Sequence, residues 1–173
     1  MNFLTLDYLK NGSEIQKRIY FVLEEYQIFD KLKEYNPILT GTFPININIK
    51  KSDLDIILEA DDLVKAQDFI INEFQNEKDF EIHFCKMNGV DSLVCNFTIE
   101  EFPVELFAQN VPTKLQNAYR HMMIEYEILE QEGEEFRKQI INLKEKGWKT
   151  EPAFAELLSL KGNPYLELLN YTK

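Results

Sequence analysis

The chain has 173 residues, 45% of them apolar, which fits one globular domain and excludes a disordered protein. No apolar run approaches the roughly 20 residues of a membrane-spanning helix, and the N-terminus lacks the basic segment of a secretory signal, so a cytoplasmic location is expected. The formal net charge of −11 weighs against a protein that coats nucleic acid, because phosphate binding depends on Lys and Arg.

The order of hydrophobic patterns and turn residues predicts an α+β protein. Ser13 and Gln16 form the pattern of a capping box, and apolar residues then recur at helical spacing. In chain order we expect a helix over 13–34, a strand over 38–41, a strand or extended loop over 43–51, a strand over 53–59, a helix over 63–76 capped by Asp61 or Asp62, strands over 80–87, 92–98 and 103–108, and helices over 112–131, 134–146, 151–160 and 164–171. This order favours a mixed β-sheet flanked by helices, with a C-terminal helical cap.

The chain is expected to divide into an α+β core, residues 1–110, and a helical region, residues 111–173, packed on that core. Charge is uneven between these two parts. Residues 1–110 contain ten basic and twenty acidic side chains, whereas residues 111–173 contain nine basic and ten acidic ones. If a polyanionic small molecule binds, the C-terminal part is therefore the better source of cationic contacts.

Three carboxylates form the strongest candidate site. Asp53 and Asp55 flank Leu54 on an expected strand, so their side chains project to the same face and Leu54 faces the core. Two like charges held side by side repel each other unless a cation lies between them. Glu105 alternates with apolar neighbours on the expected strand 103–108 and joins the pair if that strand lies next to 53–59. Three such carboxylates suit Mg²⁺, and the competing interpretation is an acidic strand end exposed to water.

These residues resemble the active-site pattern of the nucleotidyltransferase superfamily with the polymerase-β-like fold. That family carries a Gly-Gly or Gly-Ser turn, then two acidic residues that flank an apolar one, and a third acid on a later strand. The corresponding positions here are Gly41-Thr42, Asp53-Leu54-Asp55 and Glu105. Segments 40–44, 52–56, 116–121 (Gln-Asn-Ala-Tyr-Arg-His) and 149–154 (Lys-Thr-Glu-Pro-Ala-Phe) are similar to an uncharacterised bacterial branch of the superfamily, so the resemblance spans about residues 15–170.

The resemblance implies a nucleotidyltransferase-type sheet and metal-dependent transfer of a nucleoside monophosphate from a nucleoside triphosphate to a hydroxyl. Asp53, Asp55 and Glu105 would be the catalytic residues and would hold Mg²⁺ or Mn²⁺, and Glu105 could also orient or deprotonate the acceptor. The turn at Gly41-Thr42 would hold the triphosphate through backbone N–H groups and a hydroxyl.

Three more residues are expected to contact the nucleotide: Ser52, Arg120 and Lys149. Surface charge is the competing interpretation of Arg120, and a linker or helix cap is that of Lys149. Two positions depart from the family pattern, because Thr42 replaces serine or glycine and Glu105 replaces aspartate.

The expected acceptor is a small molecule or a protein side chain, since the acidic composition disfavours long nucleic acid. No membrane partner is expected. Two alternatives stay open: a catalytically inactive binding or regulatory protein of the same fold, and a metal-dependent phosphohydrolase that uses the same acids. The sequence leaves the nucleotide, the acceptor and the oligomeric state open.

Overall fold

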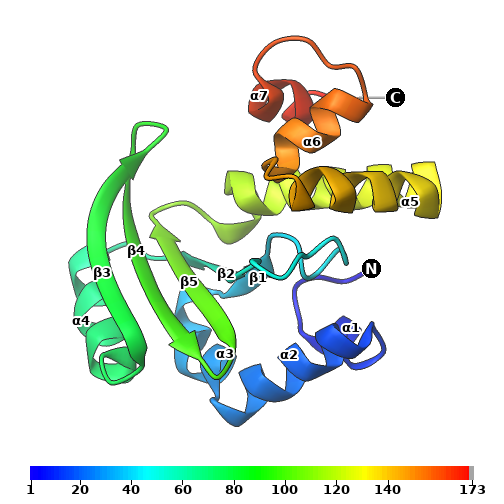
Figure 1. Ribbon diagram of the computed structural model, residues 1–173. Coiled ribbons are helices and arrows are strands. Elements are labelled where there is room, and N and C mark those ends of the chain that lie inside the picture. The colour runs from blue at the N-terminus through cyan, green and yellow to red at the C-terminus, as the bar shows by residue number, and fades with distance from the viewer. Residues whose placement is uncertain (172–173) are drawn as a thin grey trace.

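The computed structural model describes residues 1–171, so the last two residues of the expected helical region lie outside the described part. A five-stranded sheet lies beside a group of C-terminal helices (Figure 1), which confirms the expected α+β class. Along the chain the elements are α1 (Asp7–Lys10), α2 (Glu14–Glu25), α3 (Ile28–Leu32), η1 (Lys33–Tyr35), β1 (Ile38–Thr40), β2 (Leu54–Glu59), α4 (Leu63–Phe74), β3 (Lys78–Met87), β4 (Val90–Ile99), β5 (Phe102–Gln109), η2 (Thr113–Leu115), α5 (Asn117–Glu145), α6 (Thr150–Leu157) and α7 (Pro164–Leu169).

The strand order brings two distant stretches of sequence together. The strands lie in the order β1-β2-β5-β4-β3. β2 and β5 are parallel, and the other neighbouring strands are antiparallel. After β2 the chain crosses through α4 and the β3–β4 hairpin, and then returns to place β5 directly against β2. Side chains near residue 55 and near residue 105 therefore share one face of the sheet.

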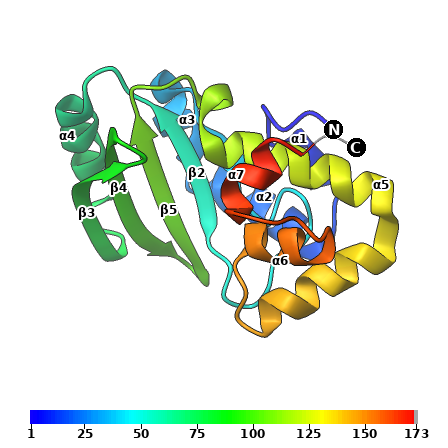
Figure 2. The same ribbon diagram turned by 90° about the horizontal axis from the view of Figure 1, so that it is seen from above.

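The two faces of the sheet differ in character. One face packs on α2, α3 and α4 through alternate strand residues, and the Phe74 ring of α4 stacks on Phe97 of β4 with centroids 5.0 Å apart. The other face carries Asp55 and Glu105. In the described part of the chain, α5, α6 and α7 lie beside β2, and no helix crosses that face of β5, β4 and β3 (Figure 2).

The C-terminal helices have a hydrophobic core of their own, joined by Phe3, Ile45 and Ile47 from the N-terminal part. α5 bends at Gly133, whose backbone (φ 80°, ψ −167°) is open essentially to glycine alone. This bend confirms the break expected between the helices 112–131 and 134–146. Neither α5 nor any other helix within residues 1–171 is long and apolar enough to cross a membrane.

One expected element differs from the structure, and one alternative that the sequence left open is decided. The single helix over 13–34 is wrong, because Gln27 takes a left-handed conformation (φ 54°) and separates α2 from α3. Residues 43–51 form a looped segment, one of the two forms expected, with successive turn bonds such as Ile47 N–H to Thr42 O at 3.0 Å. The alternation of that segment reflects Ile45 and Ile47, which point into the C-terminal core.

Candidate active site

Two of the three carboxylates lie on the neighbouring strands β2 and β5, and the third, Asp53, lies just before β2. Leu54 is fully buried in the sheet core, which directs Asp55 to the opposite face. In the parallel pairing of β2 with β5, Asp55 is the register partner of Glu105. Both side chains are half-buried, whereas Asp53, which immediately precedes β2, is exposed. The sequence made Glu105 a candidate only if its strand lay next to residues 53–59. The structure places the two strands side by side, with Glu105 and Asp55 on the same face.

Gly41 approaches the carboxyl group of Asp55 closely. Its backbone has φ +74°, and a Cβ built on it would lie 2.0 Å from Asp55 Oδ2. A side chain at this position would force the Asp55 carboxyl to move, and the positive φ also favours glycine. The turn that the sequence associates with phosphate binding is thus next to the second acid of the pair.

Thr42 and Ser52 meet across the loop that joins β1 to β2. The Thr42 hydroxyl donates to Ser52 Oγ at 3.1 Å, and Ser52 Oγ also accepts from the Ile49 N–H at 2.9 Å. Both side chains are half-buried beside the carboxylates. The structure therefore gathers two of the residues expected to contact the nucleotide at the base of one loop.

Two side chains from different parts of the molecule hold this loop. Gln16 of α2 donates from Nε2 to the carbonyls of Phe43 (2.8 Å) and Pro44 (3.1 Å), while its Oε1 accepts from Ser13 N–H in the capping box. Arg137 of α5 donates to the Ile45 carbonyl. The loop is thus fixed from both the sheet side and the helical side. Sequence reasoning identified Gln16 only as a cap and missed Arg137, which no local pattern marks.

Like charges and burial shift the pKa values of the acids. Burial, followed by the charges of Asp53 and Glu105, holds the pKa of Asp55 well above its ordinary value. Burial and the Asp53 charge also raise the pKa of Glu105, against a lowering influence from Lys149 and His83. In both shifts burial is the main cause and the neighbouring negative charge adds to it, and a bound cation would act in the opposite direction.

A buried charged group behind the acids was missed by sequence reasoning. Lys144 of α5 is 6% exposed, and burial lowers its pKa to about 8, although Glu125, Asp55, Glu151 and Asp53 all act to raise it. Glu125 is 3% exposed, its Oε1 has no hydrogen-bond partner, and burial raises its pKa to about 8. These residues sit on apolar helical stripes, where spacing alone gives no sign of a charged cluster.

The basic residues expected at the site divide into two groups. Lys149, the N-cap of α6, is exposed and acts electrostatically on Glu105. Arg120 is exposed and donates to Asn117 Oδ1 at 3.2 Å, within the first turn of α5. No ion pair or hydrogen bond in residues 1–171 joins Arg120 to the carboxylates. Its neighbour His121 links helices, with Nε2 2.9 Å from the Tyr165 carbonyl and Nδ1 3.7 Å from Glu151.

The donor set suits a hard divalent cation, although its side chains are spread apart. Within residues 1–171, no three His, Cys, Asp or Glu side chains are grouped closely enough to hold a metal ion. The residue types nevertheless suit such a cation, because the half-buried Asp55 and Glu105 are register partners on adjacent strands and the exposed Asp53 lies two residues before Asp55. Asp53 is free in solvent to change rotamer, so the residues present can serve as ligands.

The fold is similar to those of several solved structures, two of them described as polymerases. The chain is similar to a chain of the GLD-2/RNP-8 complex (20% identity, TM-score 0.55, 88% of this chain and 60% of that one). It is also similar to Cid1 poly(U) polymerase with Mg 3′-dATP bound (14% identity, TM-score 0.55, 80% of this chain and 45% of that one). A third similar structure is the polymerase core of TRAMP, an RNA surveillance complex (11% identity, TM-score 0.53, 91% of this chain and 49% of that one). These likenesses indicate a nucleotidyltransferase-like fold, and the chain spans only about half the length of these neighbours.

No curated protein matches the chain. One family model does match, over residues 21–171, which include the whole sheet and the C-terminal helices. That span contains every candidate site residue named above except Gln16. The chain therefore belongs to the family described as Domain of unknown function (DUF4269).

Proposed function

We propose that this protein is a metal-dependent nucleotidyltransferase that moves a nucleoside monophosphate from a nucleoside triphosphate to a hydroxyl group. The observation that carries the proposal is the register pairing of Asp55 with Glu105, beside Asp53 and the Gly41 turn, on a sheet of nucleotidyltransferase type. The chemistry needs acids that share one face and a phosphate-binding turn next to them, and the pairing of Asp55 with Glu105 beside the Gly41 turn supports this assignment.

The proposed roles follow from position. Asp53, Asp55 and Glu105 hold Mg²⁺ or Mn²⁺, which when bound neutralises triphosphate charge and favours ionisation of the attacking hydroxyl. Glu105 lies on β5, next to the uncovered strands β4 and β3, so it orients the acceptor hydroxyl or accepts its proton. Gly41 lets the backbone approach a phosphate, and the Thr42 and Ser52 hydroxyls are close enough to each other to share one phosphate group.

Positive charge for the triphosphate comes from the helical side. Lys149 is an exposed cation that already acts on Glu105, and Lys144 faces the aspartates from α5. Arg120 remains a proposed contact that would need the nucleotide to extend toward the first turn of α5. The division into a core of residues 1–110 and a helical region from 111 onward fits this sharing of acidic and basic groups.

The acceptor is proposed to approach over the open face of β5, β4 and β3. Asp55, Glu105, Asn96 and Glu81 form one row of register partners across that face. This row is acidic, and a polyanionic acceptor would meet it with repulsion. A small molecule or a protein hydroxyl is therefore the proposed acceptor.

The test is a transfer assay with α-labelled ATP, GTP, CTP and UTP in Mg²⁺ or Mn²⁺, with cell extract as the source of acceptors. We expect labelled product with release of pyrophosphate, and a loss of about 100-fold or more in the double variant Asp53→Asn/Asp55→Asn. Asp61→Asn, an exposed acid just beyond the far end of β2, is the matched control and keeps full activity.

Other outcomes identify the alternatives. Release of phosphate without labelled product identifies a phosphohydrolase. The absence of any turnover with any triphosphate identifies a binding or regulatory protein, the alternative favoured by the spread of the carboxylates. Either result would overturn the proposed transferase.

A further inference from the structure

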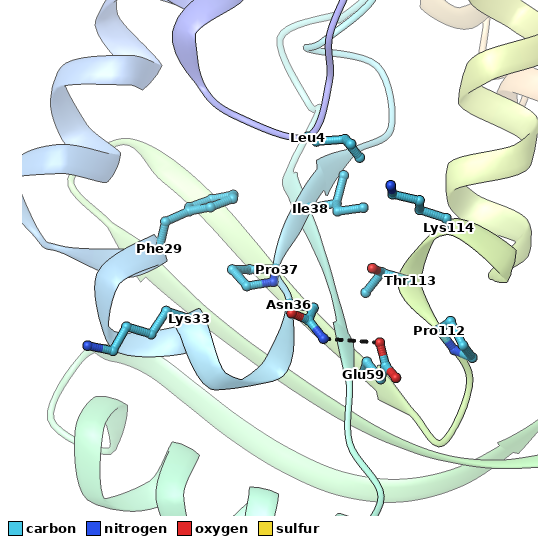
Figure 3. A pocket seen from close by; sticks show the side chains of 10 residues that line it. All are labelled: Leu4, Phe29, Lys33, Asn36, Pro37, Ile38, Glu59, Pro112, Thr113 and Lys114. Carbon is cyan, nitrogen blue, oxygen red and sulfur yellow. Dashed lines mark hydrogen bonds between the residues drawn. The ribbon is translucent and has the colours of Figure 1, made fainter.

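A cavity of about 470 Å³ lies at the opposite end of β2 from the acids. It opens beside Glu59, where β2 ends, and Pro112 and Thr113, which follow the end of the parallel strand β5 (Figure 3). None of the proposed catalytic carboxylates lines it. Its volume lies within the range of small-molecule sites in proteins, roughly 300–1,000 Å³. The cavity is thus separate from the proposed transfer site.

Hydrogen bonds at and beside this cavity hold its walls in place. Gln116, 3% exposed, donates from Nε2 to the carbonyls of Leu58 (2.8 Å) and Val111 (2.9 Å), which ties η2 to the end of β2. On the other side Asn36, in a left-handed conformation, donates to Glu59 Oε2 at 3.2 Å. A site whose walls are already held in position loses little entropy when a ligand binds.

The lining combines apolar walls with two opposite charges. Leu4, Phe29, Pro37, Ile38 and Pro112 supply the apolar surface. In Figure 3 the Lys114 ammonium lies toward Ile38 and Leu4 at one end of the cavity, the Glu59 carboxylate lies at the other end beside Asn36, and the Thr113 hydroxyl lies between them. Neither Lys114 nor Glu59 takes part in an ion pair within residues 1–171. Each charge is therefore available to a ligand.

We infer that this cavity binds a small zwitterion with an apolar side chain, of the α-amino acid class. The ligand carboxylate lies against the Lys114 ammonium and the Thr113 hydroxyl, and its ammonium lies against Glu59. A simple anion would be repelled by Glu59 and a simple amine by Lys114, whereas a zwitterion complements both. The apolar side chain then packs on Phe29, Pro37 and Leu4.

The test is a titration of the ¹⁵N-labelled full chain, followed by amide NMR shifts, with L-leucine, L-methionine and L-phenylalanine up to about 10 mM. We expect saturable shifts that are largest for Ile38, Glu59, Thr113 and Lys114. Two analogues of leucine are the matched probes: 4-methylpentanoate lacks the ammonium group and 3-methylbutylamine lacks the carboxylate. Each is expected to bind about tenfold more weakly or worse, because one charge of the site is left unpaired.

Variants locate the two contacts. Lys114→Met and Glu59→Gln should each weaken binding about tenfold or more. Lys33→Met is the control, because Lys33 lines the same cavity but extends away from the other side chains in Figure 3. Thermal unfolding of each variant checks that the fold is kept.

The inference is overturned if no amino acid produces saturable shifts, if either analogue binds as tightly as leucine, or if the variants bind like the wild type. Asp53→Asn/Asp55→Asn should bind the amino acid normally. The outcome is thus independent of whether the protein transfers nucleotides.

Discussion

Gly41 shows how one residue constrains the proposed site. Its positive φ favours glycine, and the carboxyl of Asp55 fills the space where a side chain would begin. Gly89 has a similar φ of +83°, but nothing lies within 4 Å of a Cβ built there. A comparison of alanine substitutions at the two glycines therefore distinguishes the cost of the backbone conformation from the steric effect of the Asp55 contact.

Gly41→Ala should lower the free energy of unfolding by about 1 kcal/mol more than Gly89→Ala, which carries only the conformational cost of roughly 1 kcal/mol. Gly41→Ala should also abolish any stabilisation by Mg²⁺ plus triphosphate, because Asp55 must move. Urea denaturation with and without the ligands measures both effects. Equal losses in the two variants would show that the Asp55 contact is unimportant.

The buried Glu125 predicts a pH dependence of stability. Burial raises its pKa from an ordinary 4.5 to about 8. Between these values the folded state keeps a proton that the unfolded state has lost, so the free energy of unfolding falls as pH rises from about 5 to 8. The pKa of Lys144 is lowered from 10.5 to about 8, so this residue makes the free energy of unfolding rise with pH, but only above about pH 8.

Glu125→Gln should flatten that fall by at least about 1 kcal/mol, since glutamine carries no ionisable group at the same position. Chemical unfolding at pH 5, 6, 7 and 8 measures the slope. Glu127→Gln, an exposed change on the same helix, should leave the slope unchanged. A slope in Glu125→Gln as steep as that of the wild type would show that Glu125 does not titrate in this range.

At the scale of residues, the three acids could be predicted and the buried charges could not. Asp53 and Asp55 stand out because two polar residues interrupt an apolar strand, and their i, i+2 spacing fixes a common face. Glu125 and Lys144 lie in an amphipathic helix at positions that ordinary surface charges also occupy. Only the bend of α5 at Gly133 and its packing reveal that both are buried.

At the scale of elements, the loop over residues 41–51 depends on two helices that are distant in sequence. Gln16 reaches it from α2, and Arg137 reaches it from the second half of α5. Since this loop carries Gly41 and Thr42, the position of α5 helps to set the geometry of the proposed phosphate turn.

Arg137→Met should therefore lower the free energy of unfolding by about 1.5–3 kcal/mol, the range for a hydrogen bond that involves a charged group. It should also reduce transfer activity more than the loss of stability explains, because the loop loosens. Lys138→Met, an exposed neighbour on the same helix, is the control. Unfolding and transfer assays together measure the two effects. If Arg137→Met is destabilised but keeps its activity, the position of the loop does not affect the proposed site.

The elements that sequence predicted poorly are those where local pattern and tertiary packing disagree. The apolar spacing of residues 13–34 continues through Gln27, because Ile28 and Leu32 remain buried after the chain turns. Hydrophobic periodicity reports burial, so it does not detect a turn between two buried helices. The strands of the β3–β4 hairpin, by contrast, are flanked by turn residues and were predicted closely.

At the scale of the whole molecule, the site exists because β5 inserts between β2 and β4. The sequence predicts the individual strands, and it makes Glu105 a candidate only if β5 lies next to β2. No local pattern specifies that β2 and β5 pair in parallel. Long-range topology decides that point, and the likeness to nucleotidyltransferase folds agrees with it. The proposal therefore depends most on whether Asp53, Asp55 and Glu105 act as one site.

The most direct measurement is isothermal titration calorimetry of each nucleoside triphosphate in the presence of Mg²⁺, on the wild type and on Asp53→Asn, Asp55→Asn and Glu105→Gln. We expect at least one triphosphate to bind with a dissociation constant of about 1 mM or tighter, only with the metal, and about tenfold or more weakly in each variant. Binding that needs no metal, or that is unchanged in all three variants, would contradict the account.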